Sequence, residues 1–350
     1  MADRSPARTI GAVALGAGMA ALAGLAAVGI AGRRVRRTTD PEVDSLLPAP
    51  SDVTHHHLRT HDGGTLHVVE RGAGRPLVLL HGVTLQWWVW GAQFNTLADR
   101  YRVIAWDMRG HGESVAGTDG VTLQAVADDL ATMMGDLDLH DTIVVGHSMG
   151  GMALASFCTG HHRMLHSRCS GLMFLATSVA PVALPTIVGG GAGLVNLAQR
   201  FATAGMRSPR LRYGWPDTPA TALVLRGAFG THASGAAIEE VRRMISEVSP
   251  ETAVQAGTAI AEHDVRDDLG HVDVPALVVV GDADLLTPPT HARTVVDCVP
   301  GAQLRVLQGV GHQVMQEDPE ALARLIDELA LLWERRDDAA GDAVPPLPST

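Results

Sequence analysis

The chain has 350 residues, which is long enough for one large α/β domain with an insertion or for two smaller domains. Its 46% hydrophobic and 19% charged residues are typical of a globular protein and exclude a largely disordered one. The formal net charge of -11 argues against a nucleic-acid partner, because an acidic surface repels phosphate backbones. Three cysteines, Cys158, Cys169 and Cys298, are too few and too irregularly spaced for a disulfide framework or a zinc site.

In chain order, the first feature is the uncharged segment of residues 10–30. Its length of about 21 residues would let an α-helix cross a bilayer, although its alanine and glycine content weakens insertion. We expect a retained single-pass membrane anchor here; a cleaved signal peptide and a buried helix are the alternatives. Four arginines follow the segment and two precede it, so the positive-inside tendency predicts a cytoplasmic catalytic domain, with export as the alternative.

Alternating runs of β-forming and helix-forming residues occupy most of the remaining chain. Residues 38–51 have the composition of a linker, and the folded body is expected to start near Asp52. Strand-like runs begin at Thr65, Pro76, Arg102, Thr142, Gly171, Pro275 and Ala302. Helical patterns cover residues 90–100, 123–137, 149–160, 289–298 and 319–336. Several of the strand-like runs are continuously apolar, which indicates a largely parallel sheet buried on both faces.

The alternation stops between residues 178 and 265, where helix-compatible segments replace the strand-like runs. We expect a helical lid there, inserted into an α/β core formed by residues 52–177 and 266–336. The anchor and linker then occupy residues 1–51, and residues 337–350 are expected to be a disordered tail.

A serine between glycines, in the stretch Gly146-His147-Ser148-Met149-Gly150, follows a strand-like run and opens a helical one. In this context a Gly-x-Ser-x-Gly stretch forms a sharp turn that presents the serine hydroxyl. Glycines allow strand and helix to approach closely around a strained residue. Ser148 is therefore the candidate nucleophile.

A serine nucleophile needs a base, and the base needs an orienting acid. His312 lies in a glycine-bounded loop before the last helix, and Asp282 and Asp284 follow the strand-like run from Pro275. We favour Asp284 as the acid because it lies further into the loop, and expect Asp282 to brace that turn. The order Ser, Asp, His along the chain fits this architecture.

The tetrahedral intermediate needs two N–H donors for its oxyanion. The backbone N–H of Met149, just after Ser148, is one candidate, and the N–H of Val83, in the loop after the strand from Pro76, is the other.

Five stretches together resemble serine hydrolases of the α/β-hydrolase superfamily: LLHGVT, WDMRGHGES, GHSMGG, GDADLLTPP and GVGH. The resemblance covers about residues 52–336 and is closest to carboxylesterases and monoacylglycerol lipases. It implies an eight-stranded sheet with a helical lid, and cleavage of esters, thioesters or amides through an acyl-enzyme without a cofactor. It also implies that Asp107 and Arg109 are structural. Epoxide hydrolases and haloalkane dehalogenases carry aspartate where this chain has Ser148, which argues against both.

Three tryptophans, Trp87, Trp88 and Trp90, follow the Val83 loop. They would either line a pocket for an acyl chain or pack the first helix onto the sheet, and the sequence leaves both open. The histidines of residues 55–57 and 161–166 could suggest a metal, but no carboxylate or cysteine is spaced to complete a site. We therefore expect no metal, and the resemblance implies that no cofactor is needed.

The sequence predicts a membrane-anchored carboxylic ester hydrolase that acts on lipid-like acyl esters, with Ser148, His312 and Asp284 as its triad. A carbon–carbon bond hydrolase or a cofactor-free perhydrolase on the same fold is an alternative, and a non-catalytic ligand-binding receptor is another. The expected partners are the ester substrate and the membrane. The oligomeric state and the acyl-chain length are not predictable from the sequence.

Overall fold

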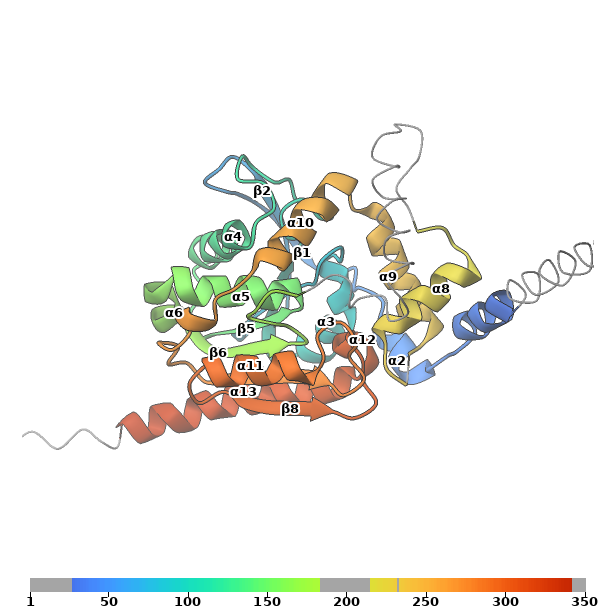
Figure 1. Ribbon diagram of the computed structural model, residues 1–350. Coiled ribbons are helices and arrows are strands. Elements are labelled where there is room, and N and C mark those ends of the chain that lie inside the picture. The colour runs from blue at the N-terminus through green and yellow to red at the C-terminus, as the bar shows by residue number, and fades with distance from the viewer. Residues whose placement is uncertain (1–26, 183–214, 232, 342–350) are drawn as a thin grey trace, which may run out of the picture.

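Eight strands form one sheet in the computed structural model of the protein, which describes residues 27–182, 215–231 and 233–341 (Figure 1). Their order across the sheet is β1-β2-β4-β3-β5-β6-β7-β8. β2 pairs antiparallel with both β1 and β4, and all other neighbours run parallel. The strands are β1 (Thr54–Arg59), β2 (Thr65–Arg71), β3 (Arg75–Leu80), β4 (Tyr101–Trp106), β5 (Thr142–His147), β6 (Cys169–Leu175), β7 (Ala276–Gly281) and β8 (Gln303–Leu307). The predicted mostly parallel eight-stranded sheet is confirmed.

The first strand is the one that the residue pattern did not predict. β1 has the sequence THHHLR, which is mostly polar, and none of its residues is fully buried. It lies at the edge of the sheet, where His57 pairs with His67 of β2. A strand that buries no complete face leaves no apolar alternation in the sequence.

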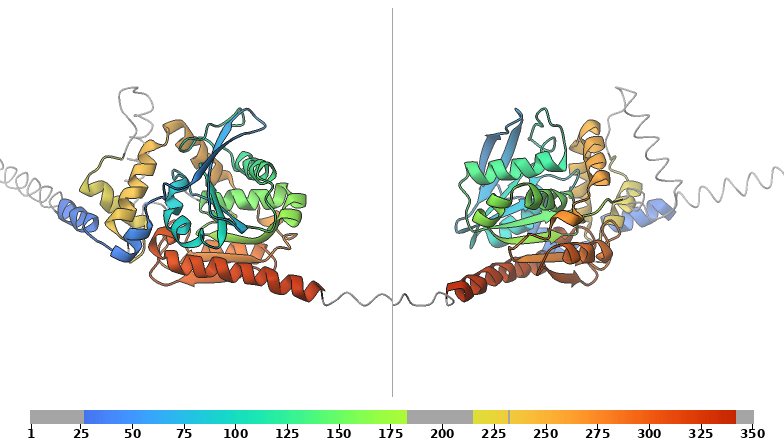
Figure 2. Two further views of the ribbon diagram at one scale, coloured as in Figure 1. Left: turned by 180° about the vertical axis from the view of Figure 1, so that it is seen from behind. Right: turned by 60° about the vertical axis from the view of Figure 1, so that its left-hand side comes forward.

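Alternate strand residues enter two hydrophobic cores, one on each face of the sheet. Figure 2 shows helices on both faces. Val144 of β5 points into the first core, whereas its neighbours Ile143 and Val145 point into the second. The first core is closed by α4 (Leu123–Asp136), α5 (Met149–Gly160) and α11 (Pro289–Cys298), and the second by α3 (Gly91–Leu97) and α13 (Pro319–Gly341). Burial on both faces is the reason that these strands are continuously apolar in the sequence.

The residues between β6 and β7 are here called the inserted segment. Its described residues form helices and no strand. These helices are α8 (Pro219–Leu225), α9 (Gly235–Glu247) and α10 (Pro250–Glu262), with short 3₁₀ helices at Arg226–Ala228 and Arg266–Asp268. They contact the loops that follow β3, β4 and the last strand, at the carboxyl ends of the strands. The contacts are Gln86 Nε2 to Glu247 Oε2 (2.7 Å), Thr252 Oγ1 to the Gly110 carbonyl (3.2 Å) and Gln316 Nε2 to Glu240 Oε2 (2.9 Å).

The predicted linker of residues 38–51 is partly wrong, because it contains the helix α2 (Pro41–Leu46). Asp40 caps this helix by accepting the N–H of Val43. Leu47 is 3% exposed, and its carbonyl oxygen lies 1.9 Å from the position that a Cβ on Gly91 would occupy. The folded body therefore starts before Asp52, and the glycine permits α2 to pack against α3.

The two chain ends extend beyond the described residues. No helix in the described ranges combines the length and apolar character needed to cross a bilayer. Residues 10–26, most of the predicted anchor, lie outside those ranges. At the other end α13 continues to Gly341, five residues beyond the predicted boundary, and residues 342–350 of the predicted tail are outside the described part.

Candidate active site

Ser148 occupies the turn between β5 and α5 in a backbone conformation that side chains rarely adopt, with φ +52° and ψ -118°. Two hydrogen bonds hold it there. The Ser148 N–H donates to the carbonyl of Leu175 (3.0 Å), and the hydroxyl of Thr177 donates to the Ser148 carbonyl (2.6 Å). A strained residue persists only where its surroundings determine its conformation, and such residues cluster at functional sites.

The glycines around Ser148 have steric roles. A Cβ on Gly146 would lie 2.6 Å from the carbonyl oxygen of Gly150. A Cβ on Gly150 would lie 2.6 Å from the carbonyl oxygens of both Leu80 and His81. These distances are too short for a side chain, so the two glycines allow β5, α5 and the end of β3 to meet at the serine.

His312 and Asp284 form a buried hydrogen-bonded pair. His312 Nδ1 lies 2.9 Å from Asp284 Oδ2, and their side chains are 5% and 0% exposed. The other carboxylate oxygen of Asp284 accepts the N–H groups of Leu286 (2.8 Å) and Thr287 (3.0 Å). Burial opposes ionisation of Asp284, but the charge of His312 and these hydrogen bonds outweigh it and lower the pKa of Asp284 to about 2. The ionised carboxylate therefore faces the Nδ1 edge of the imidazole.

Asp282 lies in the same loop and does not contact His312. Its carboxylate accepts the N–H of Gly309 at 2.6 Å, which links the end of β7 to the loop after β8. This agrees with the interpretation that Asp282 braces the turn.

His147, the residue before Ser148, connects the serine turn to the His312 loop. Its Nε2 donates to the backbone carbonyl of His312 (2.9 Å), and the two imidazole centroids are 4.8 Å apart. Burial, together with the nearby His312, lowers the pKa of His147 well below its usual range, so the ring is neutral. The Ser148 hydroxyl forms no hydrogen bond with any described residue; catalytic contacts are often long before substrate binds.

Glu317, in α12 (Val314–Glu317), stabilises the His312 loop through hydrogen bonds to the backbone. Its carboxylate accepts the N–H of Gly311 (3.0 Å) and the N–H of Gly230 (2.5 Å), which belongs to the inserted segment. The N–H of His312 itself donates to the carbonyl of Ala228 (2.9 Å). Burial raises the pKa of Glu317 to about 7. The sequence analysis did not identify Glu317, because an acidic residue just before a helix is common and does not by itself indicate a functional site.

The loop after β3 brings backbone N–H groups to Ser148. Gly82 approaches so closely that a Cβ there would lie 3.2 Å from the Ser148 Cβ. The N–H of Val83 has no acceptor among the described residues, and Met149 begins α5, where N–H groups lack a partner within the helix. Thr84 has a φ of +60°, which shows strain in this loop. Within the part of the chain that the structure describes, neither predicted oxyanion donor has a hydrogen-bond acceptor.

Two neutral histidines fix this loop. His81 donates from Nδ1 to the Gly82 carbonyl (2.7 Å) and accepts the N–H of Met108 at Nε2 (2.9 Å). Burial, with the adjacent His111, lowers the pKa of His81 to about 3. His111 accepts the N–H of Thr84 at Nε2 (3.2 Å). The WDMRGHGES stretch thus supports the loop, a role that was not assigned to His111 from the sequence.

The three tryptophans lie in different surroundings. Trp90 is fully buried in the second core and meets the His147 ring edge-on at 6.4 Å. Trp87 packs edge-on against Phe94, and Trp88 lies under the guanidinium of Arg243 on α9 (5.2 Å). The packing interpretation describes Trp90 and Trp87, whereas Trp88 joins the first helical turn to the inserted segment.

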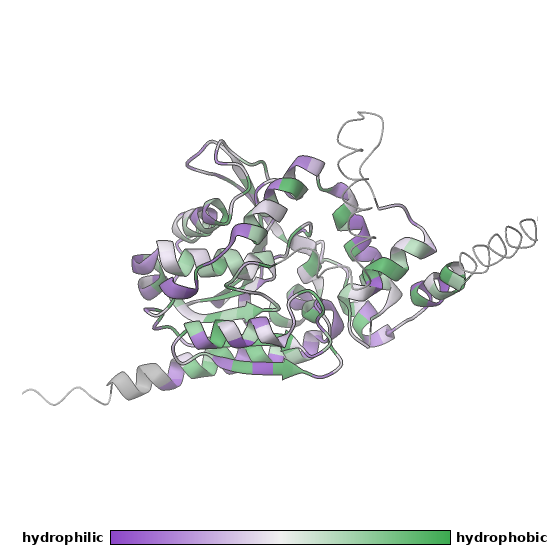
Figure 3. Ribbon diagram, in the orientation of Figure 1, coloured by the Kyte–Doolittle hydropathy of each residue, from purple (hydrophilic) through white to green (hydrophobic). Residues whose placement is uncertain are grey.

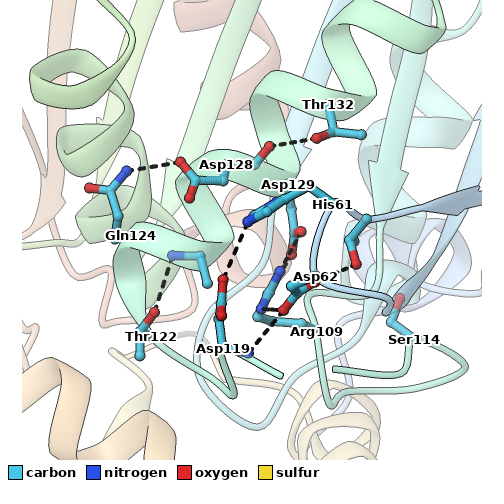
Figure 4. A network of polar contacts seen from close by, with 12 residues as sticks. His61, Asp62, Arg109, Ser114, Asp119, Thr122, Gln124, Asp128, Asp129 and Thr132 are labelled. Atoms are coloured by element: carbon cyan, nitrogen blue, oxygen red, sulfur yellow. Dashed lines mark hydrogen bonds and ion pairs between the residues drawn. The ribbon is translucent and has the colours of Figure 1, made fainter. Parts of the chain in front are cut away.

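Arg109 is buried between the carboxylates of Asp62 and Asp129 (Figure 4). It binds Asp129 of α4 through two hydrogen bonds (2.8 and 2.7 Å) and Asp62 of the β1–β2 turn through one (2.9 Å). Asp107 is also buried, and its carboxylate accepts from Nδ1 of His67 (2.8 Å). These contacts agree with structural roles for Arg109 and Asp107.

A protein-family model identifies the family to which this chain is related. The family model described as alpha/beta hydrolase fold matches residues 75–319, more than half of the chain. The chain belongs to this family. Among curated relatives of this alpha/beta hydrolase is a non-heme chloroperoxidase of Kitasatospora aureofaciens, 31% identical over 73% of this chain and 91% of that protein. A non-heme haloperoxidase of Rhodococcus erythropolis is 30% identical over 72% and 90%.

Solved structures of similar proteins include esterases. A thermophilic esterase from Thermogutta terrifontis with malate bound has a TM-score of 0.64 and 27% identity, over 81% of this alpha/beta hydrolase and 98% of that chain. Est816, described as an N-acyl homoserine lactone degrading enzyme, has a TM-score of 0.62 and 25% identity, over 78% and 99%.

Proposed function

We propose that this alpha/beta hydrolase cleaves carboxylic esters, with a preference for lipid-like acyl groups, through an acyl-enzyme on Ser148. Three observations carry the proposal: the strained serine turn, the His312–Asp284 pair that His147 links to this turn, and two N–H groups that have no acceptor among the described residues. The esterases among its structural neighbours support the same reaction class.

In the proposed reaction, Ser148 Oγ attacks the ester carbonyl carbon while His312 Nε2 takes the hydroxyl proton. The N–H groups of Val83 and Met149 stabilise the oxyanion. The carbon–oxygen bond of the ester breaks, and His312 returns the proton to the leaving alcohol. Water then attacks the acyl-enzyme with His312 as base, which releases the acid and restores Ser148. Asp284 orients His312 and stabilises its cationic form, since the low pKa of Asp284 keeps the carboxylate ionised.

Fluorophosphonate labelling tests the nucleophile. We expect one label on the wild-type protein and none on Ser148→Ala, with circular dichroism to verify that the variant is folded. A folded wild-type protein that takes no label would support a ligand-binding receptor instead. A panel of p-nitrophenyl esters tests the acyl preference: faster turnover of acetyl than of octanoyl esters would contradict the lipid-like substrate class.

Perhydrolysis is the second candidate, and the two relatives named chloroperoxidase and haloperoxidase favour it. Hydrogen peroxide would replace water in attacking the acyl-enzyme, which gives a peracid and free Ser148. The test is the ratio of peracid to acid formed at a fixed peroxide concentration. A ratio no higher than that of the uncatalysed reaction would exclude this activity. A third candidate, carbon–carbon bond hydrolysis, would require faster turnover of vinylogous diketones than of simple esters.

A further inference from the structure

The helical stretch of residues 27–36 is fixed to the inserted segment (Figures 1 and 2). A Cβ on Gly32 would lie 1.9 Å from the carbonyl oxygen of Pro219, the first residue of α8, so the two backbones are in direct contact. Arg36 forms an ion pair with Asp217 (2.8 Å). The N–H of Gly235, at the start of α9, donates to the carbonyl of Thr38 (2.7 Å). This stretch is therefore held beside α8 and α9.

The opposite face of the same stretch carries unpaired positive charge. Ile30, Arg33, Arg34 and Arg37 follow the spacing i, i+3, i+4 and i+7, which places them on one side of a helix. Ile30 is 65% exposed. The side chains of the three arginines form no ion pair or hydrogen bond with any residue in the described ranges.

The neighbouring helix α8 also carries an exposed apolar residue. Val224 is 54% exposed, although its neighbours Ala222 and Leu225 are buried against α9. Figure 3 shows α8 coloured mostly as hydrophobic beside the helical stretch of residues 27–36. An exposed surface that combines large apolar side chains with arginines has the chemistry of an interfacial membrane contact.

We propose that the surface formed by Ile30, Arg33, Arg34 and Arg37, here called the N-terminal face, docks on a lipid surface with anionic headgroups. Arginines near an anionic leaflet are attracted to it, and apolar side chains enter its interfacial region. The chain as a whole carries -11, so this cationic face gives the molecule one preferred orientation toward negative charge. The uncharged residues 10–30 directly precede the arginines in the sequence and favour lipid over a soluble anionic partner.

This docking places the inserted segment, and not the α13 side of the sheet, next to the lipid. The inserted segment also contacts the His312 loop through Ala228 and Gly230. A lipophilic ester would then reach the site from the lipid phase, a consequence that rests on the proposed function. The docking itself does not depend on catalysis.

Site-specific quenching in vesicles tests the orientation. The full chain would carry Cys298→Ser, since Cys158 and Cys169 are buried, and then one new cysteine for a fluorophore. Val224→Cys reports on α8, which contacts the helical stretch of residues 27–36, and Leu331→Cys on α13 is the matched control, with 54% and 50% exposure. With phosphatidylcholine/phosphatidylglycerol vesicles that contain a headgroup-spin-labelled lipid, we expect several-fold stronger quenching at position 224 than at 331.

Equal quenching at both positions, stronger quenching at 331, or no association with the vesicles would each overturn the proposal. Protection of the label at 224 by a second copy of the chain, in the absence of lipid, would also overturn it, because the face would then be a protein interface. Hydrolysis of a water-soluble ester, measured on the same variants, separates a failure of the proposed function from a failure of the docking.

A second experiment tests how much the charges of Arg33, Arg34 and Arg37 contribute to binding of anionic vesicles. Arg33→Gln/Arg34→Gln/Arg37→Gln is matched by Arg163→Gln/Arg293→Gln/Arg324→Gln, whose arginines lie on α6 (His162–Arg168), α11 and α13. The measured quantity is the ratio of binding to anionic and to neutral vesicles at low salt, which cancels the contribution of residues 10–30. We expect the first triple variant to lower this ratio by about 100-fold, as about fivefold for each arginine implies. An unchanged ratio, or an equal fall in the control, would overturn the proposal.

Discussion

The carboxylate of Glu317 accepts a hydrogen bond of 3.0 Å from the N–H of Gly311, the residue immediately before His312. Its other oxygen accepts the N–H of Gly230, so a single side chain joins the inserted segment to the loop of the candidate base. Glu317 is therefore a positioning residue, and replacing it tests how far the geometry of His312 depends on that link.

Glu317→Gln keeps the size of the side chain, but one of its two carboxylate oxygens becomes an NH₂ group. This group cannot accept a hydrogen bond, so the N–H of either Gly311 or Gly230 loses its acceptor. We expect kcat to fall by about 10- to 100-fold, because small displacements of a catalytic group are costly, while KM changes little. Glu320→Gln, an exposed substitution at the start of α13, is the matched control. Equal kcat values for the two variants would refute the positioning role, as would a fall in KM alone.

Asp284 and Asp282 offer a second matched pair. Asp284→Asn removes the ionised partner of His312 and leaves an amide that can present the wrong hydrogen-bonding group, so we expect kcat/KM for ester hydrolysis to fall by about 10³- to 10⁴-fold. Asp282→Asn affects only the exposed contact with Gly309 and should stay within about threefold of wild type. Steady-state kinetics on the two variants settle the choice between the aspartates; a larger loss at Asp282 would reverse it.

Gly150→Ala tests the steric requirement at the serine turn. The added methyl would meet two backbone carbonyl oxygens at 2.6 Å, and neither can move without shifting the end of β3. We expect the free energy of unfolding to fall by about 3 kcal/mol. Gly270→Ala, where nothing lies within 4 Å, should change it by no more than about 0.5 kcal/mol. Urea denaturation of both variants gives the comparison, and similar unfolding midpoints would argue against close packing at Gly150.

Glu240 predicts a pH dependence of stability. Burial raises its pKa from 4.5 to about 7, with a hydrogen bond from Gln316 acting in the opposite direction. Between these values the folded state retains a proton that the unfolded state has lost, so the free energy of unfolding falls as the pH rises from 4.5 to 7. Glu240→Gln removes this contribution and should stabilise the protein at pH 8 by about 1 kcal/mol, allowing for partial exposure, but not at pH 4.

The adjacent Glu239 supplies a control of opposite sign. A hydrogen bond from Arg242 lowers the pKa of Glu239, so its contribution to stability is present above its ordinary pKa and is lost as the pH falls. Glu239→Gln should therefore reduce stability slightly at pH 8. Thermal unfolding at pH 4 and pH 8 measures both effects, and a shift in the same direction for the two variants would contradict the assignment.

The sequence predicted the strands and helices that carry an apolar run or a regular periodicity. Seven strands and the helices α4, α5 and α11 lie where continuous apolar runs or helical periodicity placed them. β1 and α2 escaped because β1 is an edge strand rich in histidine and α2 is a short helix with no buried residue of its own. In both cases tertiary packing, and not local pattern, determines the structure.

The same distinction between local pattern and tertiary packing applies to the residues of the candidate site. Ser148, Asp284 and His312 are each marked by a local motif, and the structure brings the last two into contact. Glu317, His147 and His111 contact backbone groups of Gly230, His312 and Thr84, which lie far from them in the sequence, so spacing along the chain does not reveal these contacts. Their side chains could be recognised only once the loops were folded together.

The contact between residues 228–231 and the His312 loop has a consequence for exchanging parts between relatives. Gly230 and Gly311 approach so closely that a Cβ on Gly311 would lie 2.3 Å from the Gly230 nitrogen, and Thr231 donates to the carbonyl of Gly309 at 2.7 Å. The segment between β6 and β7 is thus not an interchangeable module. A chimera that takes this segment from a relative would need a glycine at the position of Gly230 and the same backbone path beside Gly311. Without them, the loop that carries His312 would be displaced.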